Sequence, residues 1–210
     1  MISETKKKQF DGLIQRPAIA DKNAIVFTAG YMGYDFLDLS KLTVSPKTSP
    51  IVVDMYIDLL EGLKKDGFEF NKLAFIERTL GPLMISSELS QRMNLESIVV
   101  RTRNLCSCPM CTDPKLRIKC ATTSPLLGKD NIVVISDVLT TGGTILEAVE
   151  LIKKSGARIV AVITILDRQV PKDKALSIEQ IKQEGIELRS FIKRNELLSL
   201  GFARPLKHDL

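Results

Sequence analysis

Apolar residues along the chain fall into two patterns: short unbroken runs, and stripes spaced three or four residues apart. Apolar runs at 131–135 and 158–166 are typical of buried strands, and shorter strands are predicted at 72–76, 97–100 and 186–192. The stripes predict helices over 53–65, 83–93, 144–155, 173–184 and 195–200. Strands and helices therefore alternate, which predicts an α/β fold around a parallel sheet of five strands.

The segments outside this alternation are less regular. A short apolar run lies at 24–28, and residues 31–50 are rich in Gly, Ser, Thr and Pro. This composition predicts turns and short strands. Residues 101–129 show no periodicity, which predicts a long loop or an insert.

The composition is that of a globular protein: 44% of the 210 residues are hydrophobic, 26% are charged, and the formal net charge is +5. These values fit one domain and exclude global disorder, collagen and a coiled coil. No apolar run approaches the roughly 20 residues of a membrane span. The first eleven residues are polar, so we expect a cytoplasmic protein with no membrane partner. The one histidine, His208, lies among the last three residues, which argues against catalysis centred on a buried histidine.

Residues 133–144 form the segment with the clearest chemistry. A buried strand ends just before Asp137, and Thr140 to Thr144 then open a helix. The carboxyl ends of parallel strands bind ligands, and unpaired N–H groups at a helix N-terminus favour an anion. Gly142 and Gly143 let the backbone approach a phosphate closely. The alternative is an ordinary strand-to-helix turn capped by hydroxyl groups. Neither the P-loop nor the dinucleotide glycine motif is present.

The same segment resembles the 5-phosphoribosyl 1-diphosphate (PRPP) signature of the type I phosphoribosyltransferases. The helix that follows it, the strand end at 165–169 and the segment 190–198 resemble the orotate phosphoribosyltransferases in order and spacing. The resemblance implies a single domain over 1–210, with a small hood built from about 1–50 and the C-terminal segment. It also implies Mg²⁺-dependent transfer of ribose 5-phosphate from PRPP to a pyrimidine base, orotate, with release of pyrophosphate. A homodimer is expected on the same ground.

Carried over position by position, the resemblance implies roles for individual residues. The residues expected to bind PRPP are Ser136, Asp137, Thr140, Thr141, Gly142, Gly143, Thr144, Lys47 and Arg78. The residues expected to act in catalysis are Asp137, Arg101 and Arg103. The residues expected to contact the base are Arg168 and Thr140. Arg168 has the alternative role of a strand-end arginine in an ion pair.

Three departures from the family keep a second function open. Ser136 stands where the family has an acidic residue, and the stretch 76–83 retains one glycine of the pyrophosphate loop while adding Glu77. The mobile loop of the family starts here with Arg101-Thr102-Arg103, and no histidine follows in the loop. The alternative function is therefore a catalytically impaired regulator that senses PRPP or a nucleotide and contacts nucleic acid through basic residues. A purine transferase is a third option, and the sequence Asp-Arg-Gln at 167–169 argues against it.

All four cysteines of the chain lie in the insert, at about 104–122, where the family has its mobile loop. They are Cys106, Cys108, Cys111 and Cys120. Thiolates at such short spacings form tetrahedral Zn²⁺ sites, so a structural zinc ion is predicted. Disulfides and free thiols are the alternatives.

Overall fold

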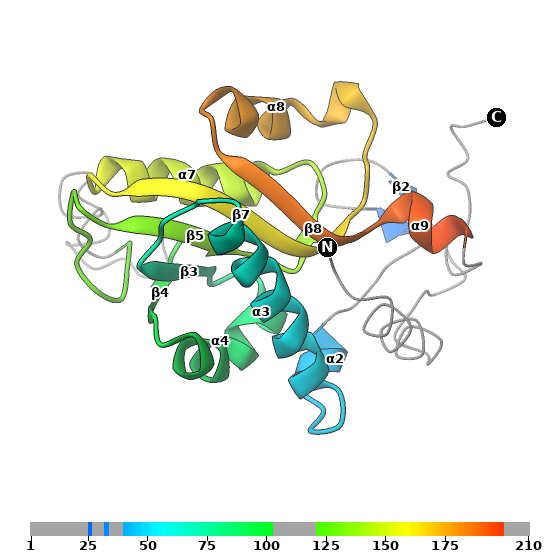
Figure 1. Cartoon of the computed structure of the whole chain (residues 1–210). Coiled ribbons are helices and arrows are strands. Elements are labelled where there is room, and N and C mark those ends of the chain that lie inside the picture. The colour runs from blue at the N-terminus through cyan, green and yellow to red at the C-terminus, as the bar shows by residue number, and fades with distance from the viewer. Residues whose placement is uncertain (1–24, 27–31, 34–39, 103–120, 200–210) are drawn as a thin grey trace, which may run out of the picture.

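The computed structural model describes residues 25–26, 32–33, 40–102 and 121–199, in which a parallel sheet lies between two layers of helices (Figure 1). The strands are β1 (Ile25–Val26), β2 (Met32–Gly33), β3 (Lys72–Ile76), β4 (Glu96–Val100), β5 (Asn131–Ile135), β6 (Val138–Leu139), β7 (Arg158–Asp167) and β8 (Glu187–Lys193). The helices are α2 (Ser40–Thr43), α3 (Ser49–Lys65), α4 (Leu80–Met93), α7 (Gly143–Lys154), α8 (Leu176–Gln183) and α9 (Arg194–Ser199), with a 3₁₀ turn at Lys172–Lys174.

The main sheet is parallel throughout its described part. Strands β4, β3, β5 and β7 lie side by side in that order, and β8 pairs with β7. The two-residue strand β6 also pairs with β7. Because β6 and β8 both pair with Leu166 and Asp167, they must lie on opposite sides of β7. Strand β6 therefore continues the line of β5. The five strands predicted from apolar runs are confirmed, and β6 is an addition to them.

Helices cover both faces of the sheet, and every residue of β3 is therefore buried. Leu73 and Phe75 belong to an apolar cluster with α3 and α4. Ala74 and Ile76 belong to a second cluster with α7 and α8. Figure 1 shows these two helical layers above and below the sheet. The unbroken apolar runs in the sequence are thus strands buried on both sides.

The helices agree with the predicted ones except near the hood. Helix α3 begins at Ser49 rather than at residue 53, because Pro50 suits the first helical turn. Helix α2 occupies part of 31–50, where turns and short strands were predicted, so that prediction is wrong for Ser40–Thr43. The buried side chain of Leu42 and the hydrogen bond from the Thr48 hydroxyl to its carbonyl favour the helical turn. The predicted polar helix at 173–184 is α8, which begins later, after the 3₁₀ turn.

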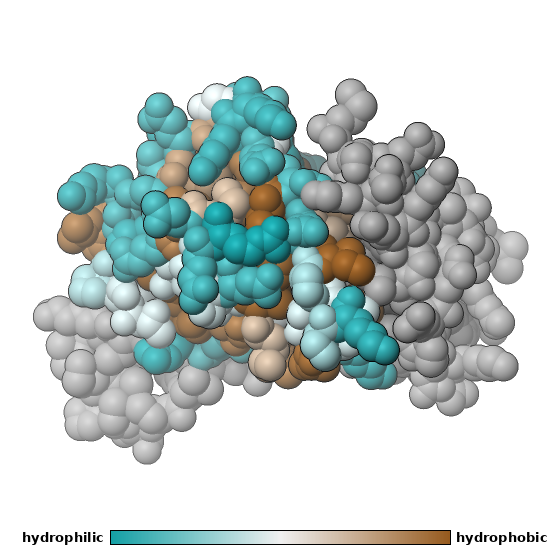
Figure 2. Space-filling view, turned by 60° about the horizontal axis from the view of Figure 1, so that its bottom comes forward, coloured by the Kyte–Doolittle hydropathy of each residue, from teal (hydrophilic) through white to brown (hydrophobic). Residues whose placement is uncertain are grey.

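The first part of the chain contributes one antiparallel pair, β1 with β2, to the described structure. Within the described ranges, no helix combines the length and the hydrophobicity needed to cross a bilayer. Figure 2 views the lower side of the molecule and shows apolar residues interspersed among polar ones. Val44, Leu80 and Met84 are more than half exposed.

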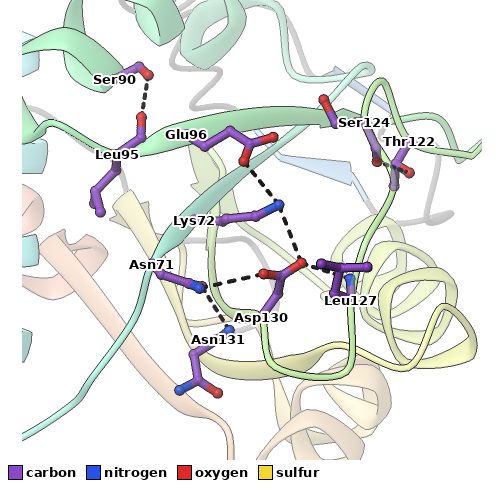
Figure 3. A network of polar contacts seen from close by, with 10 residues as sticks. All are labelled: Asn71, Lys72, Ser90, Leu95, Glu96, Thr122, Ser124, Leu127, Asp130 and Asn131. Carbon is purple, nitrogen blue, oxygen red and sulfur yellow. Dashed lines mark hydrogen bonds and ion pairs between the residues drawn. The ribbon is translucent and has the colours of Figure 1, made fainter.

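A polar network ties together the amino ends of β3, β4 and β5 (Figure 3). The Lys72 ammonium lies 3.0 Å from a carboxylate oxygen of Glu96 and 3.3 Å from one of Asp130. Asp130 also accepts a hydrogen bond from the backbone N–H of Leu127 at 2.7 Å. Burial alone would raise the pKa of Asp130, but this hydrogen bond and the charge of Lys72 outweigh burial and lower it. The network therefore stabilises the ionised carboxylate.

We predict that Asp130→Asn lowers the free energy of unfolding by about 2 to 3 kcal/mol at pH 7, because it removes one charge from a buried pair. Since the folded pKa of Asp130 lies below the unfolded one, this stabilisation is present above about pH 4 and is lost as the pH falls. Urea denaturation between pH 7 and pH 3 measures both effects. The matched control is Glu150→Gln, whose exposed pair with Lys154 is 3.9 Å long and contributes less than about 0.5 kcal/mol. A difference between Asp130→Asn and wild type that does not shrink between pH 7 and pH 3 would contradict the assignment.

Gly142 lies where the loop before α7 packs against α8. Its φ of +82° belongs to the left-handed region. A Cβ atom at this position would approach Ile178 Cγ1 to 3.0 Å and Ile178 N to 3.2 Å. At neighbouring Gly143, the nearest atom to such a Cβ would be Thr141 Oγ1 at 3.9 Å. The fold therefore requires glycine at 142 but has space for a side chain at 143.

We predict that Gly142→Ala lowers the free energy of unfolding by about 2 kcal/mol, through backbone strain and crowding against α8. Gly143→Ala is the matched control and changes it by less than about 1 kcal/mol. Thermal and urea unfolding of both variants decide the matter. Equal destabilisation by the two alanines would show that contact with α8 does not constrain the loop.

Candidate functional site

The candidate site begins just after the last residue pair between β3 and β5. The last residue pair between β3 and β5 is Phe75 with Ile135. On the other side, hydrogen bonds to β7 continue: Ser136 N donates to the Ile163 carbonyl at 3.1 Å. The Asp137 carbonyl then accepts from Ile165 N at 2.9 Å. The chain at Asp137 is therefore held on one side by β7 after its neighbour β3 has ended.

The Asp137 side chain lies at this carboxyl end of the sheet and is partly exposed. Its Oδ1 accepts a hydrogen bond from the backbone N–H of Val138 at 2.8 Å. Beneath it, the buried hydroxyl of Tyr56 donates to the Ser136 carbonyl at 2.8 Å. Burial raises the pKa of Tyr56 well above its usual range, and the negative charge of Asp137 raises it further. Tyr56 is thus a neutral hydrogen-bond donor next to the carboxylate.

The phosphate loop runs from Thr140 to Thr144 and opens α7. Thr140, Thr141 and Thr144 are partly exposed, whereas Gly142 is buried. Gly142 occupies the N-cap position, so no N-cap side chain takes up the first N–H groups of the helix. Helix α7 has 12 residues, and its positive dipole end adds to the attraction of these N–H groups for an anion. The arrangement suits a phosphate group at this point.

A buried arginine lies at the same edge of the sheet. Arg168 is 6% exposed, and its backbone N–H donates to the Leu139 carbonyl at 2.9 Å. Arg168 thereby lies next to the strand segment that leads into the phosphate loop. The structure thus places Arg168 at the same sheet edge as Asp137 and the phosphate loop, and its contact with a base stays a prediction.

A second buried arginine, Arg194, lies level with Arg168 on the adjacent strand end. Each follows directly after the last residue pair of β7 and β8. One position further along, Asn195 N donates to Gln169 Oε1 at 2.8 Å, which keeps the two chain segments together. Arg194 is 7% exposed. This edge therefore carries two buried arginines at adjacent strand ends.

The other predicted binding residues take different positions. Arg78 follows β3 and forms an ion pair with Glu147 of α7, at 3.5 Å. Lys47 is exposed in the turn between α2 and α3. Arg101 is exposed at the end of β4, and its backbone N–H donates to the Ala121 carbonyl at 2.7 Å. Contact of these three side chains with PRPP stays a prediction.

The insert lies mostly outside the described residues. Arg103, Cys106, Cys108, Cys111 and Cys120 all belong to that undescribed stretch. Its two flanks are joined by an antiparallel bridge between residues 100 and 122. Among the residues that the structure does describe, no three His, Cys, Asp or Glu side chains gather to hold a metal ion.

Two residues of the site were missed by sequence reasoning. Tyr56 belongs to the buried stripe of α3, and the stripe predicts its burial but not its partner, because Ser136 lies 80 positions away. Arg194 follows the predicted strand at 186–192, and a single arginine after a strand gives only a weak signal of a functional role. Both residues carry a polar group close to the carboxyl end of a strand, and this position is the signal that could have identified them.

Comparisons with known proteins agree with this geometry. A family model described as the phosphoribosyl transferase domain matches residues 88–189, which include Asp137, the phosphate loop and Arg168. The chain is 25% identical over 176 residues to the orotate phosphoribosyltransferase of Pyrococcus furiosus. That match covers 82% of this chain and 84% of the relative.

Solved structures share the fold. A structure of Leishmania donovani UMP synthase matches with a TM-score of 0.70 and 19% identity, and it covers 94% of this chain. The present chain spans only 38% of that longer protein. Mycobacterium tuberculosis orotate phosphoribosyltransferase in complex with PRPP matches with a TM-score of 0.62 and 18% identity, over 93% of this chain and 99% of that one.

The sheet order, the carboxylate at the end of β5 and the glycine-capped start of α7 thus occur in a chain that matches these proteins in both sequence and structure. The chain is similar to the type I phosphoribosyltransferases, and among them it is most like the orotate phosphoribosyltransferases.

Proposed function

We propose that this protein transfers ribose 5-phosphate from PRPP to a ring nitrogen of orotate and releases pyrophosphate. The observation that carries the proposal is the shared position of three groups at one sheet edge. Asp137 ends the strand, the glycine-capped α7 follows it, and Arg168 is hydrogen-bonded to the segment between them. The relatives named above support the choice of reaction.

In this proposal the chain positions a sugar phosphate and stabilises its developing charge. The N–H groups at the start of α7 and the hydroxyls of Thr140, Thr141 and Thr144 hold the 5′-phosphate. Asp137 accepts hydrogen bonds from the ribose hydroxyls and opposes the positive charge that grows on the ring as the bond to pyrophosphate breaks. The ring nitrogen of the base forms the new bond to the ribose carbon that pyrophosphate leaves, and it gives its proton to solvent.

A magnesium ion is expected to arrive with the diphosphate of PRPP. Mg²⁺ usually keeps several waters and binds through one or two carboxylates together with substrate phosphates. Asp137 offers such a carboxylate at the sheet edge. Arg78, Arg101 and Arg103 are the cationic residues proposed to assist the leaving pyrophosphate, and Lys47 is a further proposed contact of PRPP.

The charge near the base position favours an anionic base. Arg168 and Arg194 bring two largely buried guanidinium groups to adjacent strand ends. A guanidinium group binds a carboxylate through two parallel hydrogen bonds. Orotate carries a ring carboxylate, whereas hypoxanthine is neutral. We therefore favour orotate over a purine, with Arg168 in contact with the base and Thr140 nearby.

We predict that purified protein converts PRPP, Mg²⁺ and orotate to orotidine 5′-monophosphate under single-turnover conditions, and forms no product with hypoxanthine. Asp137→Asn is expected to slow the conversion by about 10²- to 10³-fold, because it removes a charge aligned with the transition state. Product is measured by chromatography after rapid quenching.

The variant Arg168→Gln separates base recognition from PRPP recognition. It is expected to weaken orotate binding while leaving the dissociation constant of PRPP within about twofold. The regulatory alternative gains no support from the comparisons. It would replace the present proposal if the wild type bound PRPP and no base gave product. Failure to bind PRPP at all would exclude both functions.

We also propose, from the cysteine spacing, that the insert binds one structural zinc ion. Elemental analysis of protein purified without chelator is predicted to find about one Zn²⁺ per chain, and Cys108→Ser is predicted to lower that content. Ser107→Ala is the matched control, because it changes the neighbouring residue and leaves the four thiols intact. A metal-free protein with four titratable thiols, or with two disulfides, would contradict the zinc proposal.

The proposed partners beyond PRPP and the base rest on the resemblance. We propose a homodimer in the cytoplasm, and light scattering with separation by size tests the oligomeric state. Contact with nucleic acid belongs to the regulatory alternative and has no support of its own.

A further inference from the structure

We propose that Tyr56 is a positioning residue for PRPP binding, because its hydroxyl fixes the strand end that carries Asp137. The choice of PRPP as ligand rests on the proposed function, whereas the role of Tyr56 rests on its hydrogen bond in the described structure. It assigns a role in ligand binding to a residue of the helical layer, outside the phosphate loop.

The hydroxyl of Tyr56 supplies a hydrogen bond that a neighbouring strand does not supply. At Ser136 the hydrogen bonds to β7 continue, but β3 has already made its last pair with β5. The Ser136 carbonyl therefore has no strand partner of β3 on that side. It accepts a hydrogen bond from the Tyr56 hydroxyl at 2.8 Å instead. A buried carbonyl left unpaired at this position would be costly, so the strand end depends on the tyrosine.

The position of this hydrogen bond makes it relevant to the ligand. Ser136 is 2% exposed and directly precedes Asp137, whose carbonyl is bound on the opposite side by β7. The peptide before Asp137 is thus held from both sides. Loss of the tyrosine hydroxyl frees one side and lets the carboxylate move relative to the start of α7. Binding of a sugar phosphate needs both groups at a fixed separation.

The surroundings of Tyr56 keep it in the required protonation state. The side chain is buried in the apolar cluster of α3, α4 and the sheet. Burial and the nearby charge of Asp137 both disfavour the phenolate. The hydroxyl consequently stays protonated and donates to the carbonyl across the pH range in which the protein is studied.

The test compares Tyr56→Phe with Ser90→Ala. Tyr56→Phe removes one oxygen atom and keeps the ring in the core. Ser90→Ala also removes one hydroxyl that donates to a backbone carbonyl, that of Leu95, but it does so at the opposite end of the sheet (Figure 3). Calorimetric titration with PRPP and Mg²⁺ is expected to show about three- to tenfold weaker binding for Tyr56→Phe and unchanged binding for Ser90→Ala.

Amide hydrogen exchange of the segment 136–144, measured without ligand, is the second readout. Tyr56→Phe is expected to speed exchange in this segment, and Ser90→Ala to leave it unchanged. Wild-type affinity for PRPP in Tyr56→Phe, or equal effects of the two variants, would overturn the inference. If the wild type itself bound no PRPP, the proposed function would fall, and the exchange measurement would still decide whether Tyr56 fixes the strand end.

Discussion

After the last pair between β3 and β5, the chain at Ser136 and Asp137 stays hydrogen-bonded to β7, and the candidate site depends on this one-sided pairing. This segment places Asp137 beyond the covered part of the sheet while its backbone remains bound to β7. The same segment leads through β6 into the glycine-capped start of α7. The end of one strand thereby brings a carboxylate, a helix N-terminus and Arg168 to a single edge, which is the usual ligand edge of parallel sheets.

The two ends of the sheet are stabilised by different means. At the amino ends, Lys72 forms ion pairs with Glu96 and Asp130 within the protein. At the carboxyl ends, the described groups include a partly exposed Asp137, uncapped N–H groups of α7 and two buried arginines. These groups give the carboxyl edge the hydrogen-bond donors and positive charge that the proposed anionic ligand needs.

Sequence patterns predicted β5 and β7 most directly, because these strands are buried on both faces and read as nearly continuous apolar runs. The motif at 133–144 predicted the turn from β5 into α7, in which the structure places Gly142 at the N-cap; phosphate binding there stays a prediction. Helix α2 was missed because four residues give no period to recognise. The link from Tyr56 to Ser136 and the level position of Arg194 and Arg168 were also missed, because they arise only when distant segments meet. The Arg78–Glu147 pair escaped sequence analysis for the same reason.

Ser136 shows how the fold accommodates a departure from the family pattern. The family resemblance places an acidic residue at this position, yet the serine here is almost fully buried, and its carbonyl is bound by the Tyr56 hydroxyl. A second carboxylate beside Asp137 would be desolvated and would lie next to a like charge, which is costly without a bound cation. Serine removes that cost and leaves Asp137 as the single carboxylate of the pair. The precision with which Asp137 is held then matters more, which is why a neutral tyrosine beneath the strand end acquires a role in binding.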